Sequence, residues 1–344
     1  MRVLMTAGFY SRGGSSIVIE NLANQLTEQG TEVTIGALAF KRFPPGGNHQ
    51  VMTLPVYNPL KLKRIIEDFD IVHNHHPLTN YLALVSRRPF IYHYHGAPDF
   101  GRGMPFRFSM LLSIKIMKQS FDAIIAVSKT GAAELKRSFS LDNIHVIYNG
   151  VNTNLFKEQY ERKFRKGTPQ FLFVGNLYAH KNVHEILFAL KKLIKLYPMA
   201  YLMIVGEGNS YDNLRNLIAE LNLQNHVSLV GYVPHNELPY YYSSSDVYIT
   251  ASRCEQFPLP LIEAWACGKP VIASNIPAHL ALLKESEAGL AYKVGSIPDL
   301  VSCMAYIYEH KDEYSEKGVS FAENNDWSLV ARRVKKLYKA VIEN

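Results

Sequence analysis

The sequence predicts an α/β protein of two doubly wound, Rossmann-like domains that face a central cleft. Apolar, strand-like runs alternate with amphipathic helical stretches from one end of the chain to the other. A polar stretch, 157–167, separates two such series. The chain has 344 residues, enough for two domains that each bury a core. Two consecutive series of this kind imply two Rossmann-like domains.

The first series predicts an N-terminal domain over residues 1–160. Its expected strands are Arg2–Phe9, Glu32–Leu38, Asp70–Asn74, Phe90–His95, Ala123–Ser128 and Ile144–Tyr148. Such nearly continuous apolar runs are typical of parallel strands that are covered on both faces. Helices fit between the strands, for example over 15–29 and 129–138.

The second series predicts a C-terminal domain over residues 168–327. Its expected strands are Gln170–Gly175, Tyr201–Gly206, Val227–Val230, Val247–Thr250 and Pro270–Ser274. Asn182 and Glu185 have the spacing of a capping box for the helix after the first of these strands. The polar stretch before this series is interpreted as a linker, with a solvated loop inside one domain as the alternative. A last helix, within 328–344, has apolar residues at helical spacing.

Composition indicates a soluble globular protein of the cytoplasm. Hydrophobic residues make up 47% of the chain and charged residues 19%. No run approaches the roughly 18 apolar residues of a membrane span, and the N-terminus enters a strand without a signal-peptide pattern. The three cysteines (Cys254, Cys267, Cys303) are too few for a disulfide framework and lack metal-ligand spacing.

The net charge of +7 is compatible with polyanionic ligands, with an anionic membrane surface, or with a merely basic protein. Nucleic-acid binding is disfavoured, because the basic residues are scattered and no recognition motif is present.

The most informative segment, 252–271, holds two glutamates eight positions apart. Glu255 follows the strand pattern that ends at Thr250, whereas Glu263 lies in a short helix that begins near Pro260. Ligands of open α/β sheets bind at the carboxyl ends of the strands. The start of the helix has free N–H groups that can hold an anion such as diphosphate. The alternative is that both glutamates belong to solvated faces.

This pattern, Glu255-x7-Glu263 followed by Ala-Cys-Gly-Lys-Pro-Val, resembles the signature of retaining glycosyltransferases of family 4, which have the GT-B fold. The resemblance covers nearly the whole chain, including Val127-Ser128-Lys129 and the segment 148–152. It implies transfer of a sugar from a nucleotide-diphosphate donor to a hydroxyl, without a metal cofactor. The donor would lie on the C-terminal domain and the acceptor mainly on the N-terminal one.

The loop after the first strand carries Gly13 and Gly14 before a helix. It is neither Gly-x-Gly-x-x-Gly nor a P-loop, so dinucleotide-binding and P-loop functions lose support. The resemblance implies that this glycine pair contacts the donor diphosphate. By itself the loop is also compatible with an ordinary βα turn.

The first loop of the second domain carries Asn176 and Lys181. Lys181 can neutralise a diphosphate whose charge grows as the sugar bond breaks. The family commonly has an arginine at the position of Asn176, and its absence removes one guanidinium from the diphosphate. Arg253, Lys269 or Arg12 are candidates to compensate.

Further binding residues follow from the resemblance. Gly206, with Tyr232 and Val233, would lie around the nucleotide. Glu255 would contact the transferred sugar, and Glu263 would accept both ribose hydroxyls, which suits a carboxylate facing a vicinal diol.

Two residues of the Glu255 loop depart from the family pattern, because many members have glycine where Gln256 and Pro258 stand. Pro258 has no N–H to offer to sugar or phosphate oxygens. Phe257 and Leu259 are expected to supply those N–H groups instead.

Histidines gather at two consecutive strand ends, in the segments 70–77 and 92–96. Three histidines within four residues suggest zinc, but ligands must converge and no cysteine is near, so we expect no metal. The resemblance implies that His95 contacts the sugar or acceptor near the reaction centre. His73 and His75 are equally compatible with strand-end packing.

The segment 104–118 is apolar with interspersed basic residues. It fits peripheral docking on a membrane that carries a lipid-linked acceptor, at its inner face, or a helix packed in the core. A glycan or a small molecule are the other acceptor classes.

Two further functions remain open: another GT-B enzyme (a phosphorylase or a nucleotide-sugar epimerase), and a non-catalytic subunit that binds sugar nucleotides.

Overall fold

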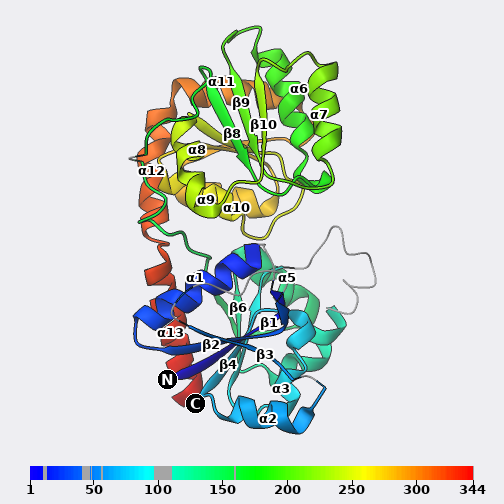
Figure 1. Ribbon diagram of the computed structural model, residues 1–344, viewed down its shortest axis with the longest axis vertical. Coiled ribbons are helices and arrows are strands. Elements are labelled where there is room, and N and C mark those ends of the chain that lie inside the picture. Colours follow the sequence, from blue (N-terminus) through cyan, green and yellow to red (C-terminus); the bar gives the residue numbers. More distant parts are fainter. Residues whose placement is uncertain are drawn as a thin grey trace. The chain divides into compact units, whose positions relative to one another are not determined.

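The computed structural model describes residues 1–10, 14–40, 47, 49–55, 57–96, 111–158 and 160–343. The chain forms two compact units (Figure 1). The first unit comprises Met1–Gly150 and Asn325–Asn344, and the second comprises Val151–Asn324. The family resemblance implies that the last helix, about 328–344, packs back on the N-terminal domain, and these residues belong to the first unit.

The described part of the first unit holds a seven-stranded parallel sheet in the order β3-β2-β1-β4-β5-β6-β7. The strands are β1 (Arg2–Tyr10), β2 (Glu32–Phe40), β3 (Gln50–Thr53), β4 (Ile71–Asn74), β5 (Phe90–Tyr94), β6 (Ala123–Ala126) and β7 (Ile144–Val146). The helices are α1 (Gly14–Glu28), α2 (Pro59–Glu67), α3 (Leu82–Val85), α5 (Lys129–Phe139) and α13 (Trp327–Glu343), with short 3₁₀ turns at η1 (Pro77–Thr79) and η2 (Lys118–Ser120).

Helix α13 (red in Figure 1) packs on α1 (blue) within this unit. Its buried residues Val330, Val334 and Leu337 recur at helical spacing, which explains why the helix is amphipathic. The hydroxyl of Tyr338 lies 2.5 Å from Nδ1 of His73, so the same helix also reaches the end of β4.

The described part of the second unit holds a six-stranded parallel sheet in the order β10-β9-β8-β11-β12-β13. The strands are β8 (Gln170–Val174), β9 (Tyr201–Val205), β10 (Val227–Gly231), β11 (Val247–Thr250), β12 (Val271–Ser274) and β13 (Gly289–Tyr292). The helices are α6 (Val183–Leu193), α7 (Tyr211–Glu220), α8 (Leu238–Ser244), α9 (Leu259–Ala266), α10 (Pro277–Ser286), α11 (Ile297–Glu309) and α12 (Lys311–Glu323), with 3₁₀ turns at η3 (Ala179–Lys181) and η4 (His235–Glu237).

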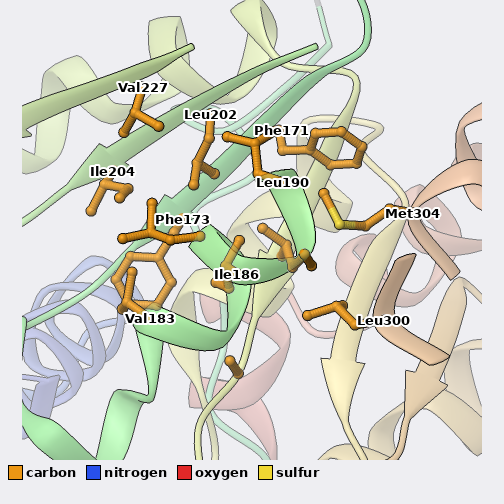
Figure 2. Packing of buried hydrophobic residues seen from close by; sticks show 14 of the residues in the cluster. Phe171, Phe173, Val183, Ile186, Leu190, Leu202, Ile204, Val227, Leu300 and Met304 are labelled. Carbon is orange, nitrogen blue, oxygen red and sulfur yellow. The ribbon is translucent and has the colours of Figure 1, made fainter. Parts of the chain in front are cut away.

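The core of this unit lies between the sheet and the helices α6 and α11. Figure 2 shows Phe171 and Phe173 of β8 in one cluster of buried side chains with Ile186 of α6 and with Leu300 and Met304 of α11. All residues of β8 and β9 are buried, because these central strands are covered on both faces. This explains their nearly continuous apolar sequences.

The predicted strands are confirmed to within two residues at each end. Two strands were missed, β3 and β13, and both lie at an edge of a sheet. Each has four residues and is only partly buried, so neither produces an apolar run that stands out in the sequence.

The predicted capping box of α6 is wrong. Asn182 adopts a left-handed conformation, with φ of 57°, and its side chain makes no capping hydrogen bond. Oε2 of Glu185 instead accepts hydrogen bonds from the hydroxyl of Tyr292, at 3.0 Å, and from the N–H of Gly295, at 3.2 Å. Tertiary partners have therefore replaced the local cap.

The predicted linker, 157–167, is not a free connection between the two units. The N–H of Phe164 donates to Oγ of Ser244 at 3.0 Å. The Arg165 guanidinium pairs with the buried carboxylate of Asp246 at 2.8 Å. These contacts hold the segment on the second unit, and the division between the units falls at Gly150 and Val151.

The strand order reverses beside the first strand of each sheet, between β1 and β4 and between β8 and β11. All the paired strands are parallel, so their carboxyl ends lie at one edge of each sheet. The loops after β8 and β11 therefore diverge on either side of a topological switch point, the usual place for a ligand in an open α/β sheet.

Candidate active site

An ion pair spans the switch point of the second unit. Lys181 ends the 3₁₀ turn η3, which follows β8, and Glu255 lies in the loop that follows β11. The Lys181 ammonium donates a hydrogen bond to Oε1 of Glu255. Their side chains are 19% and 15% exposed, so both are largely withdrawn from water but still accessible from the carboxyl edge of the sheet.

Glu255 is held in its ionised form. Burial raises the pKa of this carboxyl, but the Lys181 ammonium, with smaller contributions from His279 and Ser252, brings the pKa below its usual value. The hydroxyl of Ser252, 2.9 Å from Oε1, adds a hydrogen bond that favours the carboxylate. The site thus carries one fixed negative charge with a lysine ammonium at its side.

Glycine is required where the first two strands of this unit end. Gly206 follows β9 with φ of 141°, and a Cβ there would lie 1.9 Å from the carbonyl oxygen of Gly175, which follows β8. Because Gly206 has no Cβ, the two loops can approach each other closely. Gly206, predicted at the nucleotide, therefore has a clear structural role as well.

Glu263 is buried in α9 and both of its oxygens are engaged. Oε1 lies 3.0 Å from Nε2 of His235, and Oε2 accepts a hydrogen bond from the hydroxyl of Tyr242 at 2.9 Å. Burial, followed by the charge of Glu263, raises the pKa of Tyr242 well above its usual value, so the tyrosine remains a donor. Each carboxylate oxygen has a second lone pair that can accept a further hydrogen bond.

The N-terminus of α9 offers fewer donors than an ordinary helix. Pro258 precedes the helix and Pro260 is its second residue, so neither has an N–H. The N–H of Leu261 donates to the carbonyl of Pro258 at 3.1 Å. Leu259 therefore has a backbone N–H in the first turn of α9, as expected. Phe257, the other residue expected to donate an N–H, precedes the helix, and its side chain is buried.

Of the three residues named as candidates to compensate for Asn176, Lys269 does not fit that role. Asn176 is exposed in the loop after β8. Lys269 is buried and precedes β12, at the amino end of that strand, so it lies at the opposite edge of the sheet from Glu255. Arg253 is near the site, but it is exposed and its closest carboxylate is Glu185 at 3.9 Å. Arg12 lies outside the described residues.

Of the remaining residues predicted to contact the donor, those that the structure describes lie at the carboxyl ends of strands. Tyr232 and Val233 follow β10 at the same carboxyl edge; the tyrosine is 47% exposed, whereas the valine is 9% exposed. Gly14 is the first residue of α1, after the first strand of the first unit. Gly13 lies outside the described residues.

His95 belongs to the first unit, where it joins a ladder of four imidazoles. Nδ1 of His75 lies 3.0 Å from Nε2 of His95, and Nε2 of His73 lies 3.1 Å from Nδ1 of His93. The two pairs stack, with ring centroids of His93 and His95 4.4 Å apart and rings 11° from parallel. Burial lowers the pKa of His95 to about 4, so its imidazole is neutral.

The histidines do converge, contrary to the reasoning that set zinc aside. Nitrogen atoms of His73, His75 and His93 lie within 4.8 Å of one another. However, His73 directs Nε2 at His93 and its other nitrogen at Tyr338, an arrangement of hydrogen-bonded pairs. Burial lowers the pKa of all three imidazoles well below the usual value, so they are neutral hydrogen-bonding groups.

Four residues around the site were not predicted from the sequence: Ser252, His235, Tyr242 and His279. His279 lies in α10, fully buried, with Nδ1 3.0 Å from the carbonyl oxygen of Ser274. Burial lowers its pKa to about 4, against the opposing effect of the Glu255 carboxylate. The only signal in the sequence is a histidine two residues after the Pro277 that begins a helix, and this does not identify a site.

His279 makes stability depend on pH. Its pKa is depressed in the folded state, so the unfolded chain binds more protons between pH 6.5 and about 4. We expect its contribution to be complete above pH 6.5 and to fall by about 3 kcal/mol on acidification to pH 4. Urea unfolding at neutral and acidic pH measures this loss. The loss should be smaller in His279→Asn, and an equal loss in both proteins would contradict the assignment.

None of the helices within the described ranges is long and apolar enough to cross a membrane.

Two family models together cover almost the entire chain. Glycosyl transferases group 1 matches residues 156–339, and Glycosyltransferase Family 4 matches residues 12–155. An uncharacterized glycosyltransferase of Methanocaldococcus jannaschii is 24% identical, over 96% of this chain and 95% of its own. Phosphatidyl-myo-inositol mannosyltransferase of Propionibacterium freudenreichii is 28% identical, over 83% of this chain and 74% of its own. Among solved structures, Anabaena HepE in complex with UDP aligns with a TM-score of 0.83 at 19% identity, over 99% of this chain and 100% of its own.

Proposed function

Because the chain belongs to the glycosyl transferases group 1 family and has the GT-B fold, we propose that it is a retaining glycosyltransferase. It moves a hexosyl group from a nucleotide-diphosphate sugar to a hydroxyl acceptor. The observation that carries this proposal is the ion pair between Lys181 and Glu255 at the switch point of the second sheet. The UDP complex of the similar Anabaena structure supports a nucleotide donor.

The proposed reaction needs no covalent bond to the protein. The acceptor oxygen attacks the anomeric carbon on the face that the leaving diphosphate vacates. The bond between that carbon and the phosphate oxygen breaks, and the phosphate oxygen takes the acceptor proton. Negative charge grows on the diphosphate, and Lys181 is the cation placed to stabilise it without a metal ion.

Glu255 has two roles in this proposal. It accepts hydroxyls of the transferred sugar, and before the donor arrives it keeps Lys181 oriented at the edge of the sheet. A lysine that is already in place does not have to be ordered during the reaction. Glu263, held by His235 and Tyr242, receives the ribose hydroxyls. Gly206, Tyr232 and Val233 surround the nucleotide, and the contact of Gly13 and Gly14 with the diphosphate stays a prediction.

A second candidate function, a non-catalytic subunit that binds sugar nucleotides, is favoured by Asn176, which stands exposed where the family commonly has an arginine. Such a subunit would bind the nucleotide without releasing sugar from it. A phosphorylase would instead require inorganic phosphate for turnover, which a phosphate-free assay separates from transfer.

The acceptor side includes a surface suited to a membrane-bound acceptor. Residues 111–117 are helical, with Ile114 buried, whereas Leu112 and Ile116 are 42% and 60% exposed beside the exposed Lys115. The inward face of the described part packs in the core, and its outward face is apolar and basic, which supports the proposal of peripheral membrane docking. Residues 104–110 lie outside the described residues.

Replacing both Leu112 and Ile116 by glutamate is expected to weaken binding to anionic vesicles about tenfold, because two apolar side chains no longer enter the lipid and two negative charges are added. Vesicle co-sedimentation measures this. Leu196→Glu, at a 66% exposed leucine of the second unit, is the control. Equal sedimentation of the double variant and the wild type would remove the membrane from the proposal.

A thermal-shift screen against UDP, GDP, ADP and their sugars, with and without EDTA, tests the donor site. A ligand that binds the native state raises the melting temperature. We expect one nucleotide class to do so, unaffected by EDTA, and Lys181→Ala to reduce the shift. No shift from any of them would argue against a nucleotide donor.

A further inference from the structure

A chain of buried polar groups connects helix α10 to the candidate active site. His279, Ser274 and Ser252 are each 0% exposed. Nδ1 of His279 lies 3.0 Å from both the carbonyl oxygen and Oγ of Ser274. Oγ of Ser274 donates to the carbonyl of Ser252, and Oγ of Ser252 lies 2.9 Å from Oε1 of Glu255. The groups come from three elements, α10, the end of β12 and the loop after β11.

The direction of every hydrogen bond in this chain is determined by its acceptors. Carbonyl and carboxylate oxygens only accept. Nδ1 of His279 must therefore carry the hydrogen that points to Ser274, and the Ser274 hydroxyl must donate to Ser252. The Ser252 hydroxyl in turn donates to Glu255, the carboxylate at the end of the chain. His279 is thus the neutral Nδ1–H tautomer, which agrees with the low pKa that burial gives it.

We propose that His279 is a positioning residue for sugar transfer, which acts through Ser274 and Ser252 to fix the carboxylate of Glu255. This inference rests on the proposed function, since it assigns a role within the same site. The loop that carries Glu255 has no regular secondary structure between β11 and α9. Its position therefore depends on individual contacts such as these.

A second contact holds the start of the same loop. The N–H of Arg253 donates to the carbonyl of His180 at 2.8 Å, in the loop that also carries Lys181. Together with the Ser274–Ser252 bond, it places Ser252 between two fixed points. Misplacing a reacting group by about 1 Å can cost on the order of a hundredfold in rate. Loss of the Ser274–Ser252 hydrogen bond or of the Ser252–Glu255 hydrogen bond is therefore expected to reduce turnover.

His279→Leu and His279→Asn separate positioning from packing. Leucine fills the buried space approximately but donates no hydrogen bond. Asparagine places its amide nitrogen close to where Nδ1 lies, so it can still donate to Ser274. We expect kcat to fall about tenfold or more in His279→Leu and to recover largely in His279→Asn. Affinity for the nucleoside diphosphate alone should stay within about twofold, because Glu255 faces the sugar.

A double-mutant cycle tests whether the effect passes through Ser274. If His279 acts on Glu255 by way of this serine, Ser274→Ala and His279→Leu remove the same connection, so their effects on kcat should not add. Additive effects would contradict the route, and wild-type kcat in a folded His279→Leu protein would refute the role itself.

One measurement keeps the inference testable if sugar transfer fails. Carboxyl ¹³C NMR, with Glu255 assigned by the loss of its signal in Glu255→Gln, follows the titration of that side chain in the full chain. The pKa of Glu255 should rise in His279→Leu, because the Ser252 hydrogen bond is weakened, and stay near the wild-type value in His279→Asn. An unchanged titration in both variants would overturn the positioning role. An inactive wild type with the expected titrations would contradict the proposed function alone.

Discussion

Replacing Glu255 by glutamine is expected to lower the rate of sugar transfer about tenfold or more while the fold is retained. Glutamine keeps the shape of the side chain but removes the negative charge that orients Lys181. Lys181 and Ser252 both donate to Oε1 of Glu255, and the amide oxygen of glutamine can still accept both hydrogen bonds, so the change removes the charge and little else. Initial rates at saturating donor, together with circular dichroism spectra, measure the effect.

The matched control is Glu220→Gln, at an exposed glutamate at the end of α7 in the same unit. It removes the same charge at a distance from the switch point and should leave the rate unchanged. A wild-type rate in Glu255→Gln would refute the assignment of this carboxylate to the site.

Replacing Lys181 by alanine is expected to have an effect of similar size, about tenfold or more, through the leaving diphosphate. The change removes the cation that the proposal places beside the developing charge. It also leaves Glu255 without its main stabilising partner. Lys192→Ala, at an exposed lysine of α6, is the control for loss of positive charge in this unit.

The same variant should change the pH dependence. In the wild type, Lys181 lowers the pKa of Glu255 against the opposing effect of burial. Without the ammonium, burial dominates and the pKa rises, so the carboxylate is lost at a higher pH. The acid limb of the pH–rate profile should therefore move upward in Lys181→Ala. An unmoved limb would indicate that Glu255 does not control activity in that range.

The fold could be predicted because its information is local. Central parallel strands such as β8 and β9 are buried on both faces, so each produces a continuous apolar run. The edge strands β3 and β13 are short and only partly buried, and no such run marks them. The failed capping box at Asn182 shows the limit of local rules, because Tyr292 and Gly295 engage Glu185 from a distant part of the sequence.

The candidate site was predicted only as far as it follows strand ends. Lys181 and Glu255 come after strands that prove to be neighbours in the sheet, so the structure brings them together. The partners that orient them are set by tertiary packing. His279 of α10 contacts Ser274, whose hydroxyl donates to the Glu255 loop, and Tyr242 of α8 contacts Glu263. Neither His279 nor Tyr242 stands at a fixed distance in the sequence from Glu255 or Glu263 that a known motif would identify.

The most direct test of the proposed function uses nucleotide sugars in the presence of EDTA. Purified protein is incubated with UDP-, GDP- and ADP-sugars in phosphate-free buffer, with water or an added alcohol as the acceptor. ¹H NMR follows the release of the nucleotide. The same spectra show the anomeric configuration of the sugar product when it first appears. We expect one donor to release its nucleoside diphosphate with retained configuration. The release should be slower by about tenfold or more in Glu255→Gln. Binding of nucleotides without any release would indicate a non-catalytic subunit. Release with inverted configuration would contradict the retaining mechanism.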